Sequence, residues 1–186
     1  MIKILEFKTI MQSDIKEFVI KNMKNELNIK DNETFYKITK DLDNIQENYI
    51  NNGGNFLVAY NTETKEIAGT IAMKFENKNA VLKRFYVLEK YRKMKIGLLL
   101  YKTLEEKIKL KNIQEIYLVS GKESEYAHKF YERNGWVVEN KNPGIFIRDG
   151  AILYKKTEKT KLLKLKFFFI KKAIVLKNNK WYNANR

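Results

Sequence analysis

A cationic turn runs from Tyr91 to Gly97 and joins an apolar segment to a segment with helical spacing. The turn carries Arg92, Lys93 and Lys95, and its last residue is a glycine, which lets a ligand approach the backbone closely. The first amide groups of a helix have no partner inside that helix and lie at the positive end of its dipole. The sequence therefore predicts that this turn binds an anion, and a cofactor phosphate is the first anion to consider.

The segments on both sides of the turn have the patterns of a buried strand and an amphipathic helix. Residues 81–88 are mostly β-branched, aromatic or apolar, which is typical of a largely buried strand. After Gly97, apolar residues recur at helical spacing with charged residues between them. Because a further strand is expected at residues 115–120, the whole unit predicts a parallel, right-handed crossover. The apolar helix positions are Leu98, Leu100, Tyr101, Leu104 and Ile108.

The rest of the chain predicts a mixed α/β (α+β) fold, in which helices flank a central mixed sheet. The expected element order is β-α-α-β-β-β-α-β-α-β-β, without internal repeats. We expect residues 1–156 to form one domain and residues 157–186 to be a basic, aromatic-rich extension. The elements that we expect beyond the central unit are a strand at 2–7, helices starting near Ser13 and Asn32 (the second reaching Tyr49), a hairpin at 56–75, a helix from Ser124 that stops at Gly135, and strands at 136–138 and 151–154.

Composition excludes several kinds of chemistry. The chain has 186 residues and no cysteine, so it has no disulfide, thiolate nucleophile or cysteine-bound zinc. His128 is the only histidine, which excludes a multi-histidine metal site, and we expect no metal. Neither a signal peptide nor an apolar run of membrane-spanning length is evident, so we expect a cytoplasmic protein without a transmembrane segment.

The positive charge is concentrated in the C-terminal extension. The net charge is +15, and residues 157–186 contribute +8 of it through eight Lys and one Arg against one Glu. An added hairpin or a loosely held tail is the simpler interpretation of this extension. Contact of the tail with nucleic acid or an anionic surface, and a homodimer, remain open as partners.

Two motifs in the chain resemble those of a known family. The string LKRFYVLEKYRKMKIGLLL resembles motif A of the GNAT superfamily of acyl-CoA N-acyltransferases, whose turn has the pattern (Q/R)-x-x-G-x-(G/A) and here spans Arg92 to Gly97. Downstream, the segment from Ala127 to Trp136 is similar to the motif B pattern A-x-x-F-Y-E-K-x-G-F. The resemblance covers roughly residues 1–156 and implies the GNAT fold.

The resemblance implies acetyl-CoA as the acyl donor and a primary amine as the acceptor. Backbone amides of the turn would hold the pyrophosphate of coenzyme A, and the strand ending at Val87 would bond the pantetheine arm and polarise the thioester carbonyl. The residues that we expect to bind acetyl-CoA are Phe85, Tyr86, Val87, Arg92, Lys93, Met94, Lys95, Ile96, Gly97, Leu98 and Ser124.

Tyr131 matches the tyrosine that, in many family members, donates a proton to the departing thiolate. An unperturbed tyrosine has a pKa of about 10 and can donate at neutral pH. The alternative is a core aromatic on a short helix. Two positions depart from the family pattern: Lys95 replaces the first glycine of the turn, and Ser124 replaces a common asparagine that bonds pantetheine.

We therefore expect an N-acetyltransferase that favours a small molecule or polyamine as its acceptor, with direct attack of the amine on the thioester. Acetylation of a protein N-terminus or a lysine side chain is the open alternative for the acceptor. The N-terminal helices and the loop at 139–150 are expected to bind the acceptor. The general base is unassigned, because His128 is more simply an ordinary helix residue and only position suggests Glu76 or Glu115. The alternative is a degenerate acyl-CoA-binding or regulatory module whose basic tail binds nucleic acid or a ribosome.

Overall fold

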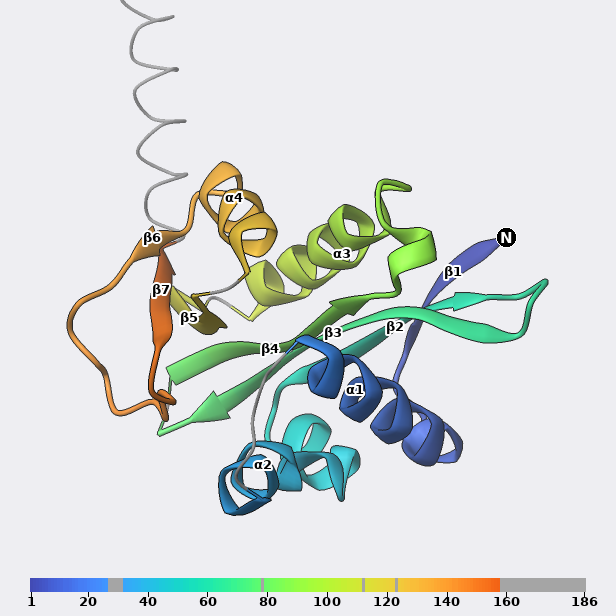
Figure 1. Cartoon of the computed structure of the whole chain (residues 1–186), viewed down its shortest axis with the longest axis horizontal. Helices are drawn as coiled ribbons and strands as arrows, with labels where there is room; N and C mark the ends of the chain where they lie inside the picture. Colours follow the sequence, from blue (N-terminus) through green and yellow to red (C-terminus); the bar gives the residue numbers. More distant parts are fainter. Residues whose placement is uncertain (27–31, 78, 112, 123, 158–186) are drawn as a thin grey trace, which may run out of the picture.

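The computed structural model describes residues 1–26, 32–77, 79–111, 113–122 and 124–157. They form a seven-stranded mixed sheet with the strand order β1-β2-β3-β4-β5-β7-β6, and helices cover both of its faces (Figure 1). The mixed α/β fold predicted from the sequence is thus confirmed. The strands are β1 (Ile2–Glu6), β2 (Asn55–Asn61), β3 (Glu66–Glu76), β4 (Asn79–Val87), β5 (Glu115–Gly121), β6 (Val137–Val138) and β7 (Ala151–Thr157).

The helices follow the predicted order, but the second predicted helix is divided. It ends at Thr39, where a 3-10 turn follows, and a π-helical turn then carries the chain to Asn51. Between these two turns, the Asn44 side chain accepts a hydrogen bond from the Glu47 amide (3.0 Å). The helical elements are α1 (Gln12–Glu26), α2 (Asn32–Thr39), α3 (Ile96–Leu110) and α4 (Glu125–Arg133), with the short turns η1 (Thr9–Met11), η2 (Lys40–Leu42), η3 (Gln46–Asn51) and η4 (Glu89–Tyr91).

Each face of the sheet has its own hydrophobic core. In β2 the side chains alternate, so that Leu57 and Ala59 join the core under α3 while Phe56 and Val58 join the core under α1. Figure 1 shows α3 and α4 on one face and α1 and α2 on the other. The cationic turn and the N-terminal helices therefore lie on opposite faces of the sheet.

The predicted crossover is present, and its two strands separate toward their carboxyl ends. Strands β4 and β5 are parallel, with α3 between them in sequence, and they pair only from Ala80 to Leu82 on β4. Beyond Leu82 the edge of β4 no longer pairs with β5. A gap between parallel strands at their carboxyl ends is where a ligand can reach the backbone of a sheet.

The C-terminal strands complete the sheet. Gly135 has a φ of +83° directly after α4, which agrees with the predicted helix stop. Strand β7 reaches Thr157, three residues beyond the predicted end of this strand, and the remainder of the proposed extension lies outside the described residues. Within the described ranges, no helix is long and apolar enough to cross a membrane.

Candidate functional site

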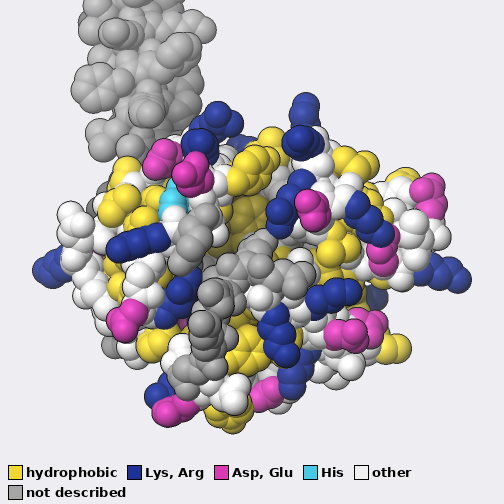
Figure 2. Space-filling view, viewed as in Figure 1, with side chains coloured by type: hydrophobic (Ala, Val, Ile, Leu, Met, Phe, Trp, Pro, Cys, Tyr) yellow, Lys and Arg dark blue, Asp and Glu magenta, His cyan; other side chains and the backbone are white. Residues whose placement is uncertain are grey.

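A cleft of about 890 Å³ lies between α4 and the strand–turn–helix unit formed by β4, η4 and α3. Figure 2 shows hydrophobic side chains in a hollow between α4 and α3, with Lys and Arg side chains gathered at its rim. Among the residues that the structure describes, four exposed cationic residues line the cleft, whereas Glu125 is the only acidic residue that does. The cleft therefore combines an apolar floor with a positively charged entrance. The four cationic residues are Arg92, Lys93, Lys95 and Arg133.

The start of α3 presents backbone amides to the cleft. The first bond that closes a turn of α3 runs from the Leu99 amide to the Lys95 carbonyl (2.9 Å), so the amides of Ile96, Gly97 and Leu98 lie ahead of it. These three residues all line the cleft. An anion at this position would meet both the helix amides and the cationic side chains, as the sequence predicts.

Lys95 adopts a left-handed backbone conformation with a φ of +60°. A side chain at such a position costs roughly 1–2 kcal/mol relative to glycine, which explains why glycine suits this place in the family pattern. The Lys95 side chain is exposed and lines the cleft, so it adds charge at the entrance and is not buried under the turn.

Side chains from the β2–β3 hairpin anchor the turn. The Tyr91 hydroxyl donates a hydrogen bond to Glu66 (2.6 Å) and accepts one from Asn61 (2.8 Å). Lys90 also bonds Glu66 (2.7 Å). The hydrogen bond from Lys90, followed by those from Tyr91 and Thr64, lowers the pKa of Glu66 to about 2. Glu66 is therefore ionised at neutral pH and holds both residues that precede Arg92.

The carboxyl end of β4 offers backbone groups to the cleft. The Leu88 amide donates to the Ala68 carbonyl of β3 (2.9 Å), and amides alternate in direction along a strand. The Val87 amide therefore points away from β3, toward the unpaired side of β4. The Val87 carbonyl accepts a hydrogen bond from the Arg92 side chain (3.3 Å), which links the strand to the turn.

Tyr131, the proton donor that the family resemblance implies, lies on α4. The ring packs against Phe130, Trp136 and Tyr154, with ring centroids 5.8–6.2 Å apart, and the side chain lines the cleft although it is only 8% exposed. A phenol that surrounding aromatic rings hold in one place can serve as a directed proton donor. Tyr131 is therefore both packed among core aromatic rings and a residue that lines the cleft.

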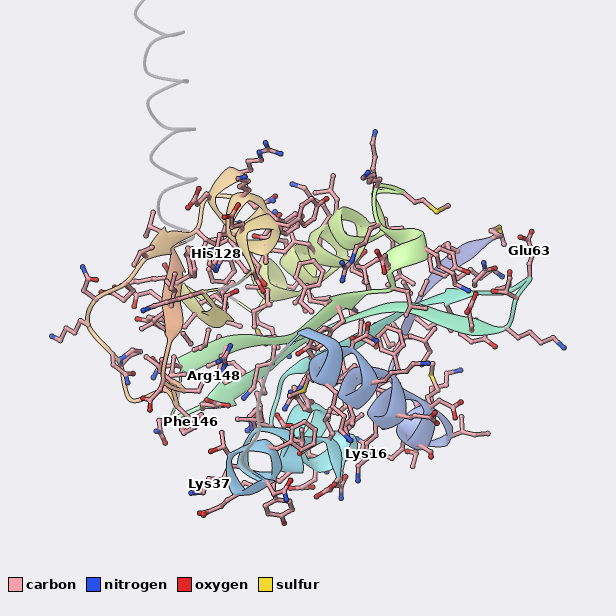
Figure 3. All side chains as sticks on the ribbon, viewed as in Figure 1. Lys16, Lys37, Glu63, His128, Phe146 and Arg148 are labelled. Carbon is pink, nitrogen blue, oxygen red and sulfur yellow. The ribbon has the colours of Figure 1, made fainter. Side chains whose placement is uncertain are left out.

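Ser124 and His128 occupy different sides of α4. Ser124 lines the cleft at the start of the helix, and its side chain makes no capping bond. His128 bonds the Gly121 carbonyl through Nε2 (2.8 Å), and its ring lies against Tyr154 of β7 (Figure 3). His128 is therefore tied to the sheet and is not among the residues that line the cleft.

Of the eleven residues that we expect to bind acetyl-CoA, all except Met94 line the cleft. Met94 is 60% exposed and lies between two left-handed residues, Lys93 (φ +67°) and Lys95. Sequence reasoning missed several other cleft residues, although Tyr126 and Phe130 are four residues apart on α4 and therefore share one helical face. The cleft residues without an individual role in the sequence prediction are Tyr91, Glu125, Tyr126, Ala127, Phe130, Arg133 and Asn134.

Neither carboxylate suggested as a base by sequence position lines the cleft. Glu76 forms ion pairs with Lys83 (2.8 Å) and Lys74 (3.7 Å), and Glu115 pairs with Lys155 (2.9 Å) at the start of β5. Both are committed to ion pairs. Among the described residues, no group of three or more acidic or histidine side chains is placed to hold a metal ion.

Comparisons with known proteins agree with this geometry. The family model described as the acetyltransferase (GNAT) domain matches residues 19–151. The crystal structure of a GNAT-family acetyltransferase from Staphylococcus aureus Mu50 is similar over 84% of this chain and 99% of that chain, with 31% sequence identity and a TM-score of 0.74. No match was found among curated proteins.

Two further solved structures share the fold at lower identity. An acetyltransferase from Streptococcus agalactiae 2603 is 24% identical, with a TM-score of 0.70 over 84% of this chain and 98% of that chain. The PaiA N-acetyltransferase from Thermoplasma acidophilum, solved in complex with coenzyme A, is 21% identical, with a TM-score of 0.67 over 84% of this chain and 99% of that chain.

Proposed function

The chain belongs to the GNAT family of acetyltransferases and is an acyltransferase, and from this premise we propose that it transfers an acetyl group from acetyl-CoA to a primary amine. The observation that carries the proposal is that one cleft contains the cationic start of α3, the open edge of β4 and the Tyr131 side chain. These are the parts needed to bind a phosphorylated thioester, polarise its carbonyl and protonate its leaving group.

The charge and the apolar lining of the cleft support acetyl-CoA as its ligand. We assign the pyrophosphate to the amides of residues 96–98 and to the cationic side chains at the entrance. Gly97 leaves room for a close approach. The apolar floor, which includes Phe85, Val87 and Phe130, suits the pantetheine arm. The structure of the Thermoplasma acidophilum protein in complex with coenzyme A supports coenzyme A as the kind of ligand.

The proposed reaction is a direct attack of the amine on the thioester. The nitrogen lone pair forms a bond to the acyl carbon, and the carbonyl oxygen becomes an oxyanion that the Val87 amide stabilises. The carbon–sulfur bond then breaks, and the thiolate takes the Tyr131 proton. The proton lost by the amine passes to water, and the Tyr131 phenolate takes up a proton from water before the next turnover. The two reactants are bound side by side, which supplies much of the rate.

The acceptor amine is expected to enter from the opposite face of the sheet. This face carries α1, α2 and the loop between β6 and β7, on which Phe146 and Arg148 lie (Figure 3). Asn79 and Asn77 hold this loop to the β3–β4 turn by bonding the Pro143 and Gly144 carbonyls (3.0 and 2.8 Å). A small molecule or polyamine is the acceptor class that we propose.

The test is a panel of primary amines, from monoamines to polyamines and amino-terminal peptides, assayed with acetyl-CoA by release of free thiol. Acetyl transfer predicts amine-dependent thiol release and an acetylated amine in the product. Binding of acetyl-CoA without release for any amine would favour the alternative, an acyl-CoA-binding or regulatory module. A gel-shift comparison of chains 1–157 and 1–186 on RNA and DNA tests the tail contact proposed for that module.

We also propose a cellular location, an oligomeric state and a domain boundary for this chain. A cytoplasmic location, a homodimer and the division of the chain near residue 156 remain predictions from the sequence. Fractionation tests the first of these, light scattering tests the second, and limited proteolysis tests the third.

A further inference from the structure

An arginine with a left-handed backbone lies in the middle of β4. Arg84 has a φ of +55°, which non-glycine residues adopt rarely, yet its side chain is buried. The register between β3 and β4 shifts at this point, because Thr70 faces Tyr86 whereas Ala72 faces Lys83. Strand β4 therefore contains one extra residue, which is a β-bulge.

The bulge directs two consecutive side chains to one carboxylate. Neighbouring side chains in a regular strand point to opposite faces. Here, however, Nζ of Lys83 lies 3.8 Å from Oδ2 of Asp41, and Arg84 forms an ion pair with the same carboxylate. The Tyr49 hydroxyl donates a hydrogen bond to Asp41 (2.7 Å) and accepts one from Arg84 (3.1 Å). Arg84 also donates to the Ile38 carbonyl. We call Arg84, Asp41 and Tyr49 the Arg84 clamp.

The Arg84 clamp is buried and charged. Burial raises the pKa of Asp41, but Arg84, Lys83 and the Tyr49 hydroxyl together outweigh this effect, so the pKa lies below its ordinary value. Asp41 and Tyr49 belong to the N-terminal helical layer, at η2 and η3. The clamp therefore ties this layer to the bulge from the face opposite the cleft.

The residues that follow the bulge line the cleft. Phe85, Tyr86 and Val87 come directly after Arg84, and the Thr70 hydroxyl holds the Arg84 carbonyl from β3 (2.7 Å). Successive residues of a strand point their side chains to opposite faces of the sheet and their backbone amides to opposite edges. One extra residue therefore moves the side chain of every later residue to the other face and its amide to the other edge. The bulge thus determines which backbone groups of β4 face the cleft.

We propose that Arg84 is a positioning residue: held by Asp41 and Tyr49, it fixes the β4 bulge and so aims the Val87 amide into the cleft. This inference rests on the proposed function, since the aimed amide affects a rate only if a thioester carbonyl binds there. The buried network on one face of the sheet then controls the reaction on the other face.

The mildest test removes one hydroxyl from the clamp. Tyr49→Phe keeps the ring and its packing against Phe56 but deletes both hydrogen bonds. The matched control is Tyr117→Phe on β5, which also deletes the hydroxyl of a buried tyrosine that donates to a carboxylate (Glu115, 2.9 Å). We expect Tyr49→Phe to lower kcat about tenfold with the best amine of the panel and to change the Kd for acetyl-CoA less than about threefold. Tyr117→Phe is expected to change neither.

Hydrogen exchange tests the inference without an acceptor. In the acetyl-CoA complex, we expect the amides of residues 85–87 to exchange at least about tenfold faster in Tyr49→Phe than in the wild type or Tyr117→Phe. The double variant Asp41→Asn/Arg84→Gly keeps the backbone allowed at φ +55° and removes both charges. It should show the same loss of protection if the clamp holds the bulge.

Each outcome decides between the explanations. Equal exchange at residues 85–87 and equal kcat in Tyr49→Phe and Tyr117→Phe would overturn the inference, even if Tyr49→Phe were less stable. Wild-type protection in the double variant would also overturn it, because the bulge would then need only a permissive backbone. Failure of every amine in the wild type would instead overturn the proposed function, while hydrogen exchange would still report on the clamp.

Discussion

A Cβ atom placed on Gly97 would lie 3.5 Å from Cγ2 of Val87, which is ordinary van der Waals contact. The fold therefore does not require glycine at this position, where the first turn of α3 faces the cleft. We predict that Gly97→Ala leaves the free energy of unfolding unchanged or raises it by about 0.5 kcal/mol. The added methyl group occupies the approach of a pyrophosphate, so the Kd for acetyl-CoA should rise about tenfold by calorimetric titration.

Gly69→Ala is the matched contrast to this variant. A Cβ atom on Gly69 would lie 2.7 Å from the Tyr86 carbonyl oxygen, a distance at which the backbone must move. We expect a loss of stability of about 2 kcal/mol in urea unfolding. If Gly97→Ala were instead as destabilising as Gly69→Ala, the fold would require glycine at position 97. A weaker Kd for acetyl-CoA could then result from damage to the fold and would not indicate a pyrophosphate site.

Lys95 combines a strained backbone with a useful charge. Lys95→Gln keeps the Cβ atom and removes the cation, so we predict a Kd for acetyl-CoA about fivefold weaker at low salt, corresponding to about 1 kcal/mol. The difference from the wild type should shrink as the salt concentration rises, because screening weakens exposed charges. Titration at several ionic strengths measures this effect. An unchanged Kd at low salt would exclude a role for the charge.

Lys95→Gly separates the backbone from the charge. Relief of the left-handed strain, offset in part by the greater freedom of glycine in the unfolded chain, should raise the free energy of unfolding by about 0.5 kcal/mol. The Kd is expected to match that of Lys95→Gln. Tighter binding than in the wild type would mean that the Lys95 side chain crowds the pyrophosphate.

The Arg84 clamp also predicts how stability depends on acid. The pKa of Asp41 is lower in the folded chain than in the unfolded chain, so its contribution is complete above the unfolded value of about 3.9 and disappears as the pH falls through the folded value. The free energy of unfolding should fall between about pH 5 and pH 2, and Asp41→Asn should make this fall shallower. Urea titrations across this range measure the slope.

Glu66 titrates in the same range and requires its own control. Its pKa of about 2 is also below the ordinary value, so the stability that ionised Glu66 contributes is likewise lost as the pH falls through this acidic range. Glu66→Gln should therefore also flatten the slope, and the double variant should be flatter than either single variant. Equal slopes for the wild type and Asp41→Asn would show that Asp41 is not selectively stabilised as a carboxylate.

Local sequence patterns were sufficient for much of this fold. The apolar periodicity after Gly97 predicted α3, and the glycine after α4 predicted the helix stop at Gly135. These features depend on neighbours in sequence, so they can be read without tertiary structure. The turn predicted to bind an anion belongs to the same class, because its amides and charges are local. Ten of the eleven expected acetyl-CoA-binding residues accordingly line the cleft.

Features that depend on distant residues could not be predicted in the same way. Arg84 adopts its left-handed backbone among partners such as Asp41, which is 43 residues away, and nothing in the strand pattern indicates that contact. The end of α2 at Thr39 is likewise not indicated by the sequence, because the apolar spacing of the second predicted helix continues to Tyr49. Met94 lies within the motif but does not line the cleft, and the residues on both sides of it have left-handed backbone conformations.

Tyr131 provides the chemical prediction. Tyr131→Phe retains the packing against Trp136 and Tyr154 and removes only the proton donor. We predict a kcat about 100-fold lower, with the Kd for acetyl-CoA unchanged within about twofold. Stopped-flow thiol release and calorimetry measure the two quantities. Equal turnover by wild type and variant across the pH range would assign the proton to solvent or to another group.

The most direct measurement of the central proposal follows an isotopically labelled acetyl group from acetyl-CoA to the best amine of the panel by mass spectrometry. The proposal predicts that the label appears on the amine nitrogen and that one free thiol is released for each amide formed. Thiol release without a labelled amide, or tight binding of acetyl-CoA with neither product, would contradict it.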